Sequence, residues 1–305
     1  MAANRFPTMQ HRYFGDVGDF GKYGLLRALC GIGEESRLKL GIVWYLFPDE
    51  FHNEDGKHVG YLRKIDPAFR DCDELLYDKL RSLLFDGSML IGGNRHLRSA
   101  ESFLPEDSVY YTQPLSYAPG QSISLRSAAR SEWLRGALSA TESTDLIFMD
   151  PDNGIECSSI SRTSAKGPKY AYWTDIDAFV GRGQSVLVYH HLNRSKPHDK
   201  QIEEKIAQIC QRYPIEVGTC AVTFTRGTSR AYFLIAAAKQ KDLLFNRMVR
   251  IGAGKWGRHF VSHAHQIGDR GPHALHLRGI FHDPSRPYDP EERAKAWAAV
   301  TKRLA

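Results

Sequence analysis

The sequence predicts an α/β fold of the Rossmann-like kind, with a mostly parallel central sheet, helices on both faces and a terminal antiparallel hairpin. Segments with helical periodicity alternate with short apolar segments, which favours parallel strands joined by helices. Residues 216–238 form two β-rich runs around a glycine-containing turn, which predicts the hairpin. The 305-residue chain is 42% hydrophobic and 25% charged, so its composition is that of a globular protein and excludes global disorder.

Helix and strand alternate in the first half of the chain. Residues 22–30 carry apolar side chains at helical spacing after a glycine-rich entry, and residues 38–47 are β-branched and aromatic, as in a buried strand. A polar loop is expected over 48–58. A helix over 73–85 and a strand over 108–113 follow.

The second half continues the alternation. We expect a helix over 126–140, a strand over 143–149, a helix over 175–183 that ends at glycine, a strand over 184–191 and a helix over 198–213. The hairpin then closes the sheet, with one edge strand running antiparallel.

The C-terminal end differs from the rest, with little apolar periodicity before residue 289. The stretch 289–305 predicts a helix with Asp289 as N-cap and Pro290 at the first helical position. We therefore expect one α/β domain over residues 1–285, and a C-terminal helix over 286–305 that packs on it or extends from it.

Charge and cysteine content narrow the setting of the protein. A formal charge of +6 is compatible with a nucleic-acid or nucleotide partner, although many enzymes of small molecules are as basic. No run approaches 18 apolar residues, which argues against a membrane span, and the N-terminus lacks the apolar region of a secretory signal. Five cysteines without a C-x-x-C pair fit free thiols in a reducing cytoplasm, where we expect the protein to reside.

Polar residues follow the expected strands at the point where each one ends. The most prominent cluster is Asp-Pro-Asp-Asn-Gly at 150–154, directly after the apolar run 146–149. Turn chemistry alone would explain such a pentapeptide. Its recurrence at two further strand ends favours a site, because ligands of open parallel sheets bind beyond the carboxyl ends of the strands. The side chains expected on this rim are Asp49, Asp150, Asp152, Asn153, His190, His191 and Arg194.

The histidines of the sequence give weaker signals. Adjacent strand residues point to opposite faces, so one of His190 and His191 is expected to be structural. Arg194 offers a forked guanidinium for a phosphate or a carboxylate. His263 and His265 form an H-x-H pair but lack a third metal ligand at recognisable spacing.

The N-terminal stretch YFGDVGDFGKYG, residues 13–24, contains four glycines ahead of the first expected helix. Glycines allow a backbone to approach a ligand closely, and a helix N-terminus favours an anion. The alternative is a flexible entry loop. The spacing matches neither a phosphate-binding G-x-x-x-x-G-K-[ST] loop nor G-x-G-x-x-G, and Lys22 is expected on the first helical turn.

These pieces together resemble the bacterial large-subunit ribosomal RNA adenine-N6 methyltransferases over roughly residues 10–260. The stretch YFGDVGDFGKYGLLRAL is similar to the family's N-terminal segment, and DLIFMDPDNGIE stands where the family has a D-P-P-Y tetrad. The resemblance implies the class I methyltransferase fold with S-adenosylmethionine as cofactor. It implies that Asp150 accepts from the exocyclic amine of adenine and that Lys22 lies near the cofactor carboxylate.

On that basis we divide the candidate residues into three groups: catalytic residues Asp150, Asp152 and Asn153, cofactor-binding residues Lys22, Asp16, Asp19 and Asp49, and substrate-binding residues His190, His191 and Arg194.

The sequence also departs from the family pattern. Asp152 replaces the second proline of the tetrad, and Asn153 replaces the aromatic residue that stacks on the base. The glycine-rich turn after the first strand is replaced by FPDEFHNEDGK, and the acidic residue after the second strand is not visible.

Three functions follow from this mixture of likeness and departure. The first is methyl transfer to a base amine, which needs alignment of a lone pair more than acid–base help. The second is a metal-dependent hydrolase or nuclease, with a divalent cation held by Asp150, Asp152 and Glu156 and a histidine as base. The third is a non-catalytic module that binds nucleotides or nucleic acid.

Two structural expectations accompany these functions. Lys22 and Asp150 should share one cleft, and this cleft should accept an anionic or nucleotide-like ligand. Lys22 and Arg194 should be exposed, so that replacing both by alanine would leave the melting temperature nearly unchanged.

Overall fold

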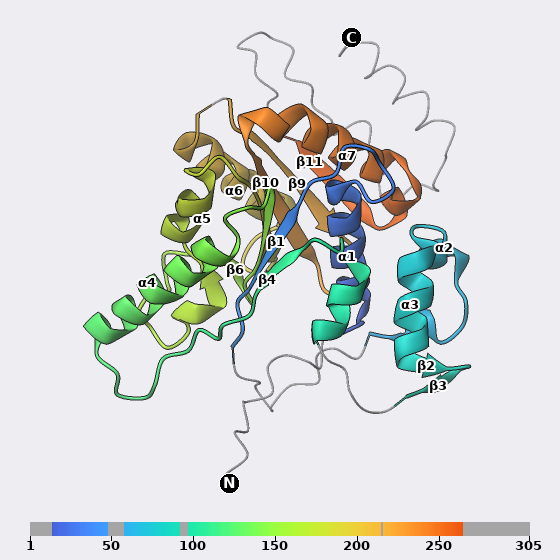
Figure 1. Cartoon of the computed structure of the whole chain (residues 1–305), viewed down its shortest axis with the longest axis horizontal. Coiled ribbons are helices and arrows are strands. Elements are labelled where there is room, and N and C mark those ends of the chain that lie inside the picture. Colours follow the sequence, from blue (N-terminus) through green and yellow to red (C-terminus); the bar gives the residue numbers. More distant parts are fainter. Residues whose placement is uncertain (1–13, 48–57, 92–96, 215, 265–305) are drawn as a thin grey trace.

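The computed structural model describes residues 14–47, 58–91, 97–214 and 216–264, and it confirms the predicted fold class (Figure 1). A seven-stranded sheet has the order β11-β9-β10-β8-β5-β1-β4, with parallel neighbours from β4 to β8 and antiparallel neighbours from β8 to β11. Its strands are β1 (Leu40–Trp44), β4 (Val109–Tyr111), β5 (Leu146–Asp150), β8 (Ser185–His191), β9 (Gly218–Phe224), β10 (Arg230–Ala236) and β11 (Phe260–Ala264).

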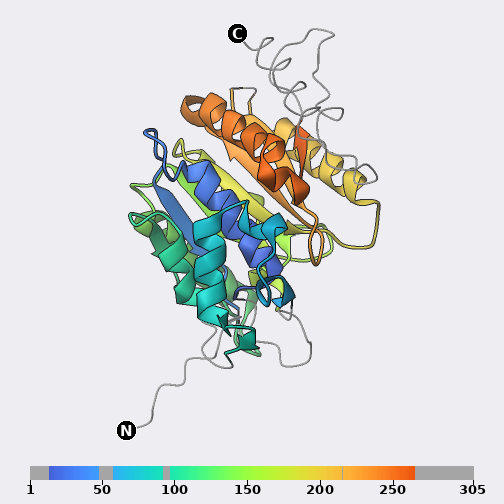
Figure 2. The ribbon, with the colours of Figure 1, turned by 90° about the vertical axis from the view of Figure 1, so that its right-hand side faces the viewer.

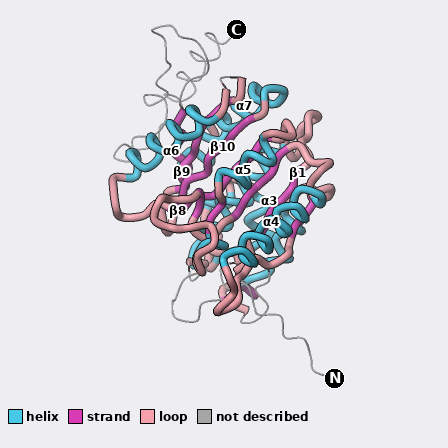
Figure 3. The backbone as a smooth tube through the Cα atoms, turned by 90° about the vertical axis from the view of Figure 1, so that its left-hand side faces the viewer, coloured by secondary structure: helices cyan, strands magenta, loops and turns pink. Residues whose placement is uncertain are grey.

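Helices cover both faces of the sheet. One layer contains α1 (Val17–Cys30), α3 (Glu74–Leu84) and α7 (Lys241–Ala253), and Figure 2 looks onto it. The short helix α2 (Pro67–Arg70) packs against α3. The other layer contains α4 (Ile123–Ala140), α5 (Trp173–Val180) and α6 (His198–Arg212), and Figure 3 looks onto it. Two small ribbons complete the fold: β2 (Phe85–Asp86) with β3 (Met89–Leu90), and β6 (Gly154–Ile155) with β7 (Tyr170–Ala171).

Strand β5 is the buried centre that its apolar run predicts. It lies between β1 and β8, and its first four residues are fully buried. Leu146 and Phe148 pack in the core under α1, whereas Ile147 and Met149 pack in the core under α4 to α6. The strand ends at Asp150, which places this carboxylate at the carboxyl edge of the parallel strands, as expected.

The hairpin of β9 and β10 is present, but it does not form the edge of the sheet as the sequence predicts. Its second strand, β10, inserts between β8 and β9, so the hairpin lies inside the sheet. The edge is formed by β11, which pairs with β9. Neither α7 nor β11 is predicted above, although α7 repeats apolar residues at helical spacing and buries Leu244, Met248 and Ile251 among others.

The first helix begins earlier than the sequence predicts. Helix α1 starts at Val17, so the glycine-rich stretch is largely helical and Lys22 lies beyond the first turn. The glycines serve close packing here. A Cβ atom on Gly21 would lie 2.5 Å from the Phe224 ring, and one on Gly24 would lie 2.1 Å from the Trp256 ring. Glycine therefore lets α1 approach these aromatic side chains closely, and the expectation of an entry loop is wrong.

Several predictions fall on residues that the structure does not describe: the loop with Asp49, the position of His265 and the C-terminal helix over 289–305. All five cysteines are free thiols. Within the described ranges, no helix combines the length and the apolar character that a membrane span requires.

Candidate functional site

A row of polar and aromatic side chains crosses the sheet at its carboxyl edge, beneath α1. Trp44 of β1 is the neighbour of Asp150 on β5, and Tyr189 of β8 is the neighbour of Tyr232 on β10. Trp44 and Tyr232 belong to the core on the α1 side of the sheet, and Tyr189 packs against it. Asp150 faces the same helix, because it accepts a hydrogen bond from Lys22.

Lys22 is the centre of this site. Its Nζ lies 2.9 Å from Asp150 Oδ2 and 2.9 Å from Asp19 Oδ1, and 5.3 Å from the centre of the Trp44 ring. The contact with Asp150 joins residues 128 positions apart and confirms that the two side chains lie together. Lys22 is only 9% exposed, so the expectation that it is a solvated cation is wrong.

The two aspartates at the start of α1 extend the charge network. Asp16 caps the helix by accepting from the Asp19 N–H at 2.8 Å. Asp19 Oδ2 accepts from the Tyr23 hydroxyl and from the Gly15 N–H, both at 3.1 Å. A second cation comes from the hairpin, since Arg230 Nη1 lies 3.8 Å from Asp16 Oδ1. These contacts fix the acidic side chains beside Lys22.

Among the residues that the structure describes, carboxylates outnumber cations in this network, because Asp16, Asp19 and Asp150 face Lys22 and Arg230. Burial raises the pKa of Asp150 above its usual value, and the Lys22 ammonium offsets only part of that effect. Burial and the Asp19 charge raise the pKa of Asp16. The described charges therefore favour a ligand that brings a positive charge of its own, rather than a simple anion.

Tyr232 adds a polar group that has no partner. Its ring and hydroxyl are fully buried, and the hydroxyl makes no hydrogen bond to any described residue. Burial raises its pKa well above the usual value, as does the nearby Tyr189. A buried hydroxyl without a partner is uncommon and requires an explanation, which a ligand or an ordered water would provide.

Sequence reasoning missed four members of this site: Trp44, Tyr189, Arg230 and Tyr232. One signal was available for each, since all four lie near strand ends at alternating positions that place them on the face of Asp150. The position of the hairpin beside β8 was needed to use that signal, and strand periodicity does not reveal it.

The second half of the strand-end turn is held away from Asp150. Asp152 forms an ion pair with Lys169 at 3.0 Å, and the Asn153 N–H donates to the Lys169 carbonyl at 2.9 Å. Glu156 Oε1 accepts from the Trp173 N–H at 2.7 Å, at the start of α5. Asp150, Asp152 and Glu156 thus have different partners, and the described residues contain no group of three potential metal ligands.

The structure separates the two adjacent histidines. His190 lies on the face opposite Asp150, where its Nδ1 accepts from the Ile155 N–H at 3.1 Å and its ring meets Phe233 edge-on. Burial, with the charges of Lys205 and His191, lowers the pKa of His190 to about 3. It is therefore neutral at physiological pH and has a structural environment. His191 is exposed on the face of Asp150.

The remaining candidates lie farther along the chain. Arg194 is exposed beyond the end of β8. His263, on β11, is within hydrogen-bond distance of Thr223 Oγ1 at 2.9 Å. No contact between Arg194 and the network around Lys22 is present among the described side chains.

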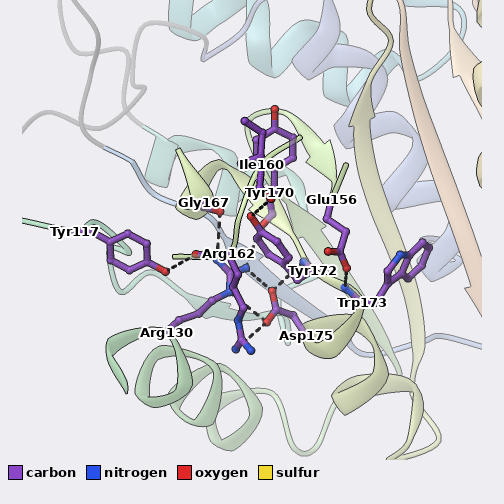
Figure 4. A network of polar contacts seen from close by, with 10 residues as sticks. All are labelled: Tyr117, Arg130, Glu156, Ile160, Arg162, Gly167, Tyr170, Tyr172, Trp173 and Asp175. Atoms are coloured by element: carbon purple, nitrogen blue, oxygen red, sulfur yellow. Dashed lines mark hydrogen bonds and ion pairs between the residues drawn. The ribbon is translucent and has the colours of Figure 1, made fainter. Parts of the chain in front are cut away.

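A second ionic network lies on the other face of the sheet (Figure 4). Arg130 of α4 is fully buried and forms an ion pair with Asp175 at the start of α5. Its guanidinium also donates to the carbonyls of Gly167 and Tyr170, at 3.3 and 2.8 Å, and lies 4.6 Å from the Tyr172 ring centre. Asp175 in turn accepts from the Tyr172 N–H at 3.0 Å. Each nitrogen of the Arg130 guanidinium thus has an acceptor, while Nε of the neighbouring Arg162 has no partner among the described residues.

Comparison with known proteins found a distant structural likeness among solved structures and no match by sequence. No family model matches the sequence, and no curated protein matches it. Among solved structures, the chain is similar to protein LPL1258 from Legionella pneumophila, described with the family model DUF519. The two chains are 14% identical, with a TM-score of 0.40, and the alignment covers 82% of this chain and 95% of the other. This likeness is too distant to support an argument about function.

Proposed function

We propose that the protein is an S-adenosylmethionine-dependent methyltransferase that acts on an exocyclic amine of a nucleic-acid base. The observation that carries the proposal is the contact of 2.9 Å between Lys22 Nζ and Asp150 Oδ2, at the carboxyl end of the central strand. Ligands of open α/β sheets bind at this edge. The resemblance of the N-terminal segment and of the strand-end tetrad gives the same two residues a place beside the cofactor.

The charges around Lys22 fit this cofactor. S-adenosylmethionine carries a carboxylate, an ammonium and a sulfonium, so it brings one more positive than negative charge. In the part of the chain that the structure describes, the site has three carboxylates and two cations, and the rings of Trp44 and Tyr189 lie in the same row. Lys22 and Arg230 would hold the carboxylate, and the acidic side chains at the start of α1 would hold the ammonium. When bound, the cofactor supplies an electrophilic methyl group.

Asp150 then has two tasks. Its carboxylate accepts a hydrogen bond from the acceptor amine and orients the nitrogen lone pair, which is the main requirement of amine methylation. The alkylated amine must also lose a proton. Because burial raises the pKa of Asp150, this carboxylate is a better proton acceptor than an exposed aspartate.

Lys22 links the two binding events. Without a ligand, its ammonium neutralises Asp150 and Asp19. A cofactor carboxylate that bound Lys22 would weaken the hold on Asp150 and leave that carboxylate available to the amine. Lys22 is thus a positioning residue in this proposal, while Asp150 is the catalytic residue.

Isothermal titration with S-adenosylmethionine and S-adenosylhomocysteine tests the cofactor assignment. We expect the parent to bind, and Lys22→Met to weaken binding at least tenfold, since a charge-assisted hydrogen bond would be lost. Lys39→Met is the matched control, because Lys39 is a half-buried lysine whose Nζ donates to Ser143 Oγ, away from Asp150. Equal weakening by both lysine variants would contradict the assignment.

Transfer is measured separately, with radiolabelled cofactor and total RNA or DNA as acceptor, followed by nucleoside analysis. Asp150→Asn should bind the cofactor but transfer at a rate at least 100-fold lower. Binding without transfer by the parent would favour a non-catalytic module. A thermal shift with divalent cations, and none with the cofactor, would favour the metal-dependent hydrolase.

A further inference from the structure

A closed loop follows the strand-end turn and returns to it. Residues 156–169, which we call the 156–169 loop, connect β6 to β7, and these strands pair in parallel through Gly154 and Tyr170. The Asn153 N–H donates to the Lys169 carbonyl at 2.9 Å, and the Glu156 N–H donates to the Ala171 carbonyl at 2.8 Å. Both ends of the loop are thereby fixed beside the turn that contains Asp150.

Side chains from α4 and from the segment before it hold the body of the loop. Arg126 Nη1 donates to the Thr163 carbonyl at 3.0 Å, and the Tyr117 hydroxyl donates to the Arg162 carbonyl at 3.1 Å. Arg130 holds the Gly167 carbonyl on the other side of the loop, as Figure 4 shows. A surface loop tied at so many points presents its outward side chains in a fixed arrangement.

The exposed residues of the loop include Lys166 and three serines, whereas Lys169 is buried. Apart from Glu156 at its start, the loop has no acidic residue, while Arg162, Lys166 and Lys169 are positively charged. Lys169 is balanced by Asp152, and Arg162 shares Asp175 with Arg130. The exposed hydroxyl residues of the loop are Ser158, Ser159 and Ser161.

The loop therefore carries excess positive charge. Two guanidiniums share the single carboxylate of Asp175, and Lys166 is exposed without an ion pair to any described carboxylate. Arg126 contributes a further guanidinium from α4, and it lies 5.7 Å from the Tyr117 ring centre. Arginine, lysine and serine side chains are the groups with which proteins contact nucleic-acid phosphates.

We propose that the 156–169 loop binds the phosphate backbone of a nucleic acid and thereby delivers a base to Asp150. The ion pair between Lys169 and Asp152 ties the loop two residues from that carboxylate. The part of this proposal in which the base reaches Asp150 rests on the proposed methyl transfer. The backbone contact itself needs no cofactor, so it is tested without one.

Fluorescence anisotropy with a labelled 20-nucleotide single-stranded RNA, and with a DNA of the same sequence, measures this contact over a series of salt concentrations. For Lys166→Ala we expect the plot of log association constant against log salt concentration to become shallower, with a slope about 1 smaller in magnitude. The affinity should fall roughly fivefold at low salt. Lys166→Glu should weaken binding further. Lys239→Glu is the matched control. Lys239 is exposed in the turn after β10, at the end of the strands opposite to the carboxyl edge that contains Asp150.

The outcomes separate the loop from the proposed function. Equal slopes for the parent, Lys166→Ala and Lys239→Glu would overturn the loop assignment, even if the cofactor binds. Loss of nucleic-acid affinity in Lys166→Ala, with cofactor affinity unchanged, would support it. A parent that binds neither probe at low salt would also overturn it. If RNA binding depends on Lys166 but no cofactor binds, the loop assignment stands and the methyl-transfer proposal fails.

Discussion

The two ionic networks of this protein use similar residues for different ends. Around Arg130, the buried Asp175 carboxylate meets that guanidinium and, at 3.8 Å, the guanidinium of Arg162, and backbone carbonyls accept further donors of Arg130. Around Lys22, three carboxylates meet two cations, and the nearby Tyr232 hydroxyl has no described partner. Each guanidinium nitrogen of Arg130 has an acceptor, as a structural ion pair requires, whereas the described residues around Lys22 leave a buried hydroxyl without a partner and an excess of carboxylates, which a ligand would balance.

The largest expected effect is at Arg130, where loss of stability would show that this network is structural. We expect Arg130→Met to lower the free energy of unfolding by about 3–5 kcal/mol, because it leaves the buried Asp175 carboxylate with only the Arg162 guanidinium, at 3.8 Å, to offset its charge. Urea unfolding followed by circular dichroism measures this loss. Arg135→Met on the same helix is the control, since Arg135 is exposed and pairs with the exposed Glu132. A loss no larger than that of the control would mean that the Arg130 network is not structural.

Lys22 should give a smaller loss of stability and a larger loss of binding. Its side chain is 11% exposed and that of Asp150 is 17% exposed, so we expect Lys22→Met to cost about 2 kcal/mol. The double variant Lys22→Met with Asp150→Asn should recover about half of this loss, since the unpaired charge is removed. Strict additivity in the unfolding experiment would show that the two side chains do not interact.

The pH dependence of stability also tests the charge balance between Lys22 and Asp150. Because the folded-state pKa of Asp150 is raised, its contribution to stability is present below the unfolded value of 3.8 and is lost as pH rises through the folded value. Lys22→Met should raise that pKa further. The stability deficit of the variant should therefore be small near pH 3.5 and grow toward pH 7, and a deficit that does not depend on pH would contradict the charge balance described for the site.

His190 should behave in the opposite sense. Its folded pKa of about 3 lies below the unfolded value of 6.5, so its contribution to stability is present above pH 6.5 and is lost as pH falls. We expect a slope on the order of 1 kcal/mol per pH unit below 6.5, which His190→Asn should reduce. Unfolding curves from pH 4 to pH 7 test this, and His191→Asn, which removes only the weakest of the three causes of the shift, should change the slope less than His190→Asn does.

Asp152 should show the smallest effect. Its carboxylate is 25% exposed and pairs with Lys169, so Asp152→Asn should cost about 1 kcal/mol or less. Cofactor affinity should stay within threefold of the parent, in contrast to Lys22→Met. If Asp152→Asn instead abolishes a thermal shift produced by a divalent cation, the metal-dependent alternative gains support.

The sequence allowed prediction of elements that local pattern determines. The apolar run before Asp150 predicts a central strand, and the periodicity of Ile202, Ile206 and Ile209 predicts α6, because burial of one face imposes both patterns. The proximity of Lys22 and Asp150 followed from the resemblance, which places both residues beside the cofactor pocket. The length of α1 could not be predicted in this way. Its glycines are typical of a loop, and only the side chains that pack against them show why a helix has glycine there.

The rest of the site depends on pairings between distant residues. Arg230 and Tyr232 reach the network only because β10 inserts beside β8, a choice that depends on the whole sheet. The ion pair between Arg130 and Asp175 joins residues 45 positions apart. Nothing in the local pattern of either residue indicates its partner, because an arginine on an amphipathic helix usually faces water.

The insertion of β10 also has a consequence for how the chain is made. During synthesis β8 is complete at His191, but the strand that must pair with it ends only at Ala236, after β9 has already emerged. Until then, β8 presents an open row of N–H and C=O groups, and β9 has no permanent neighbour. An unpaired strand edge invites association with other chains. Ribosome-bound fragments that end between residues 200 and 225 should therefore need chaperones more than fragments that include β10.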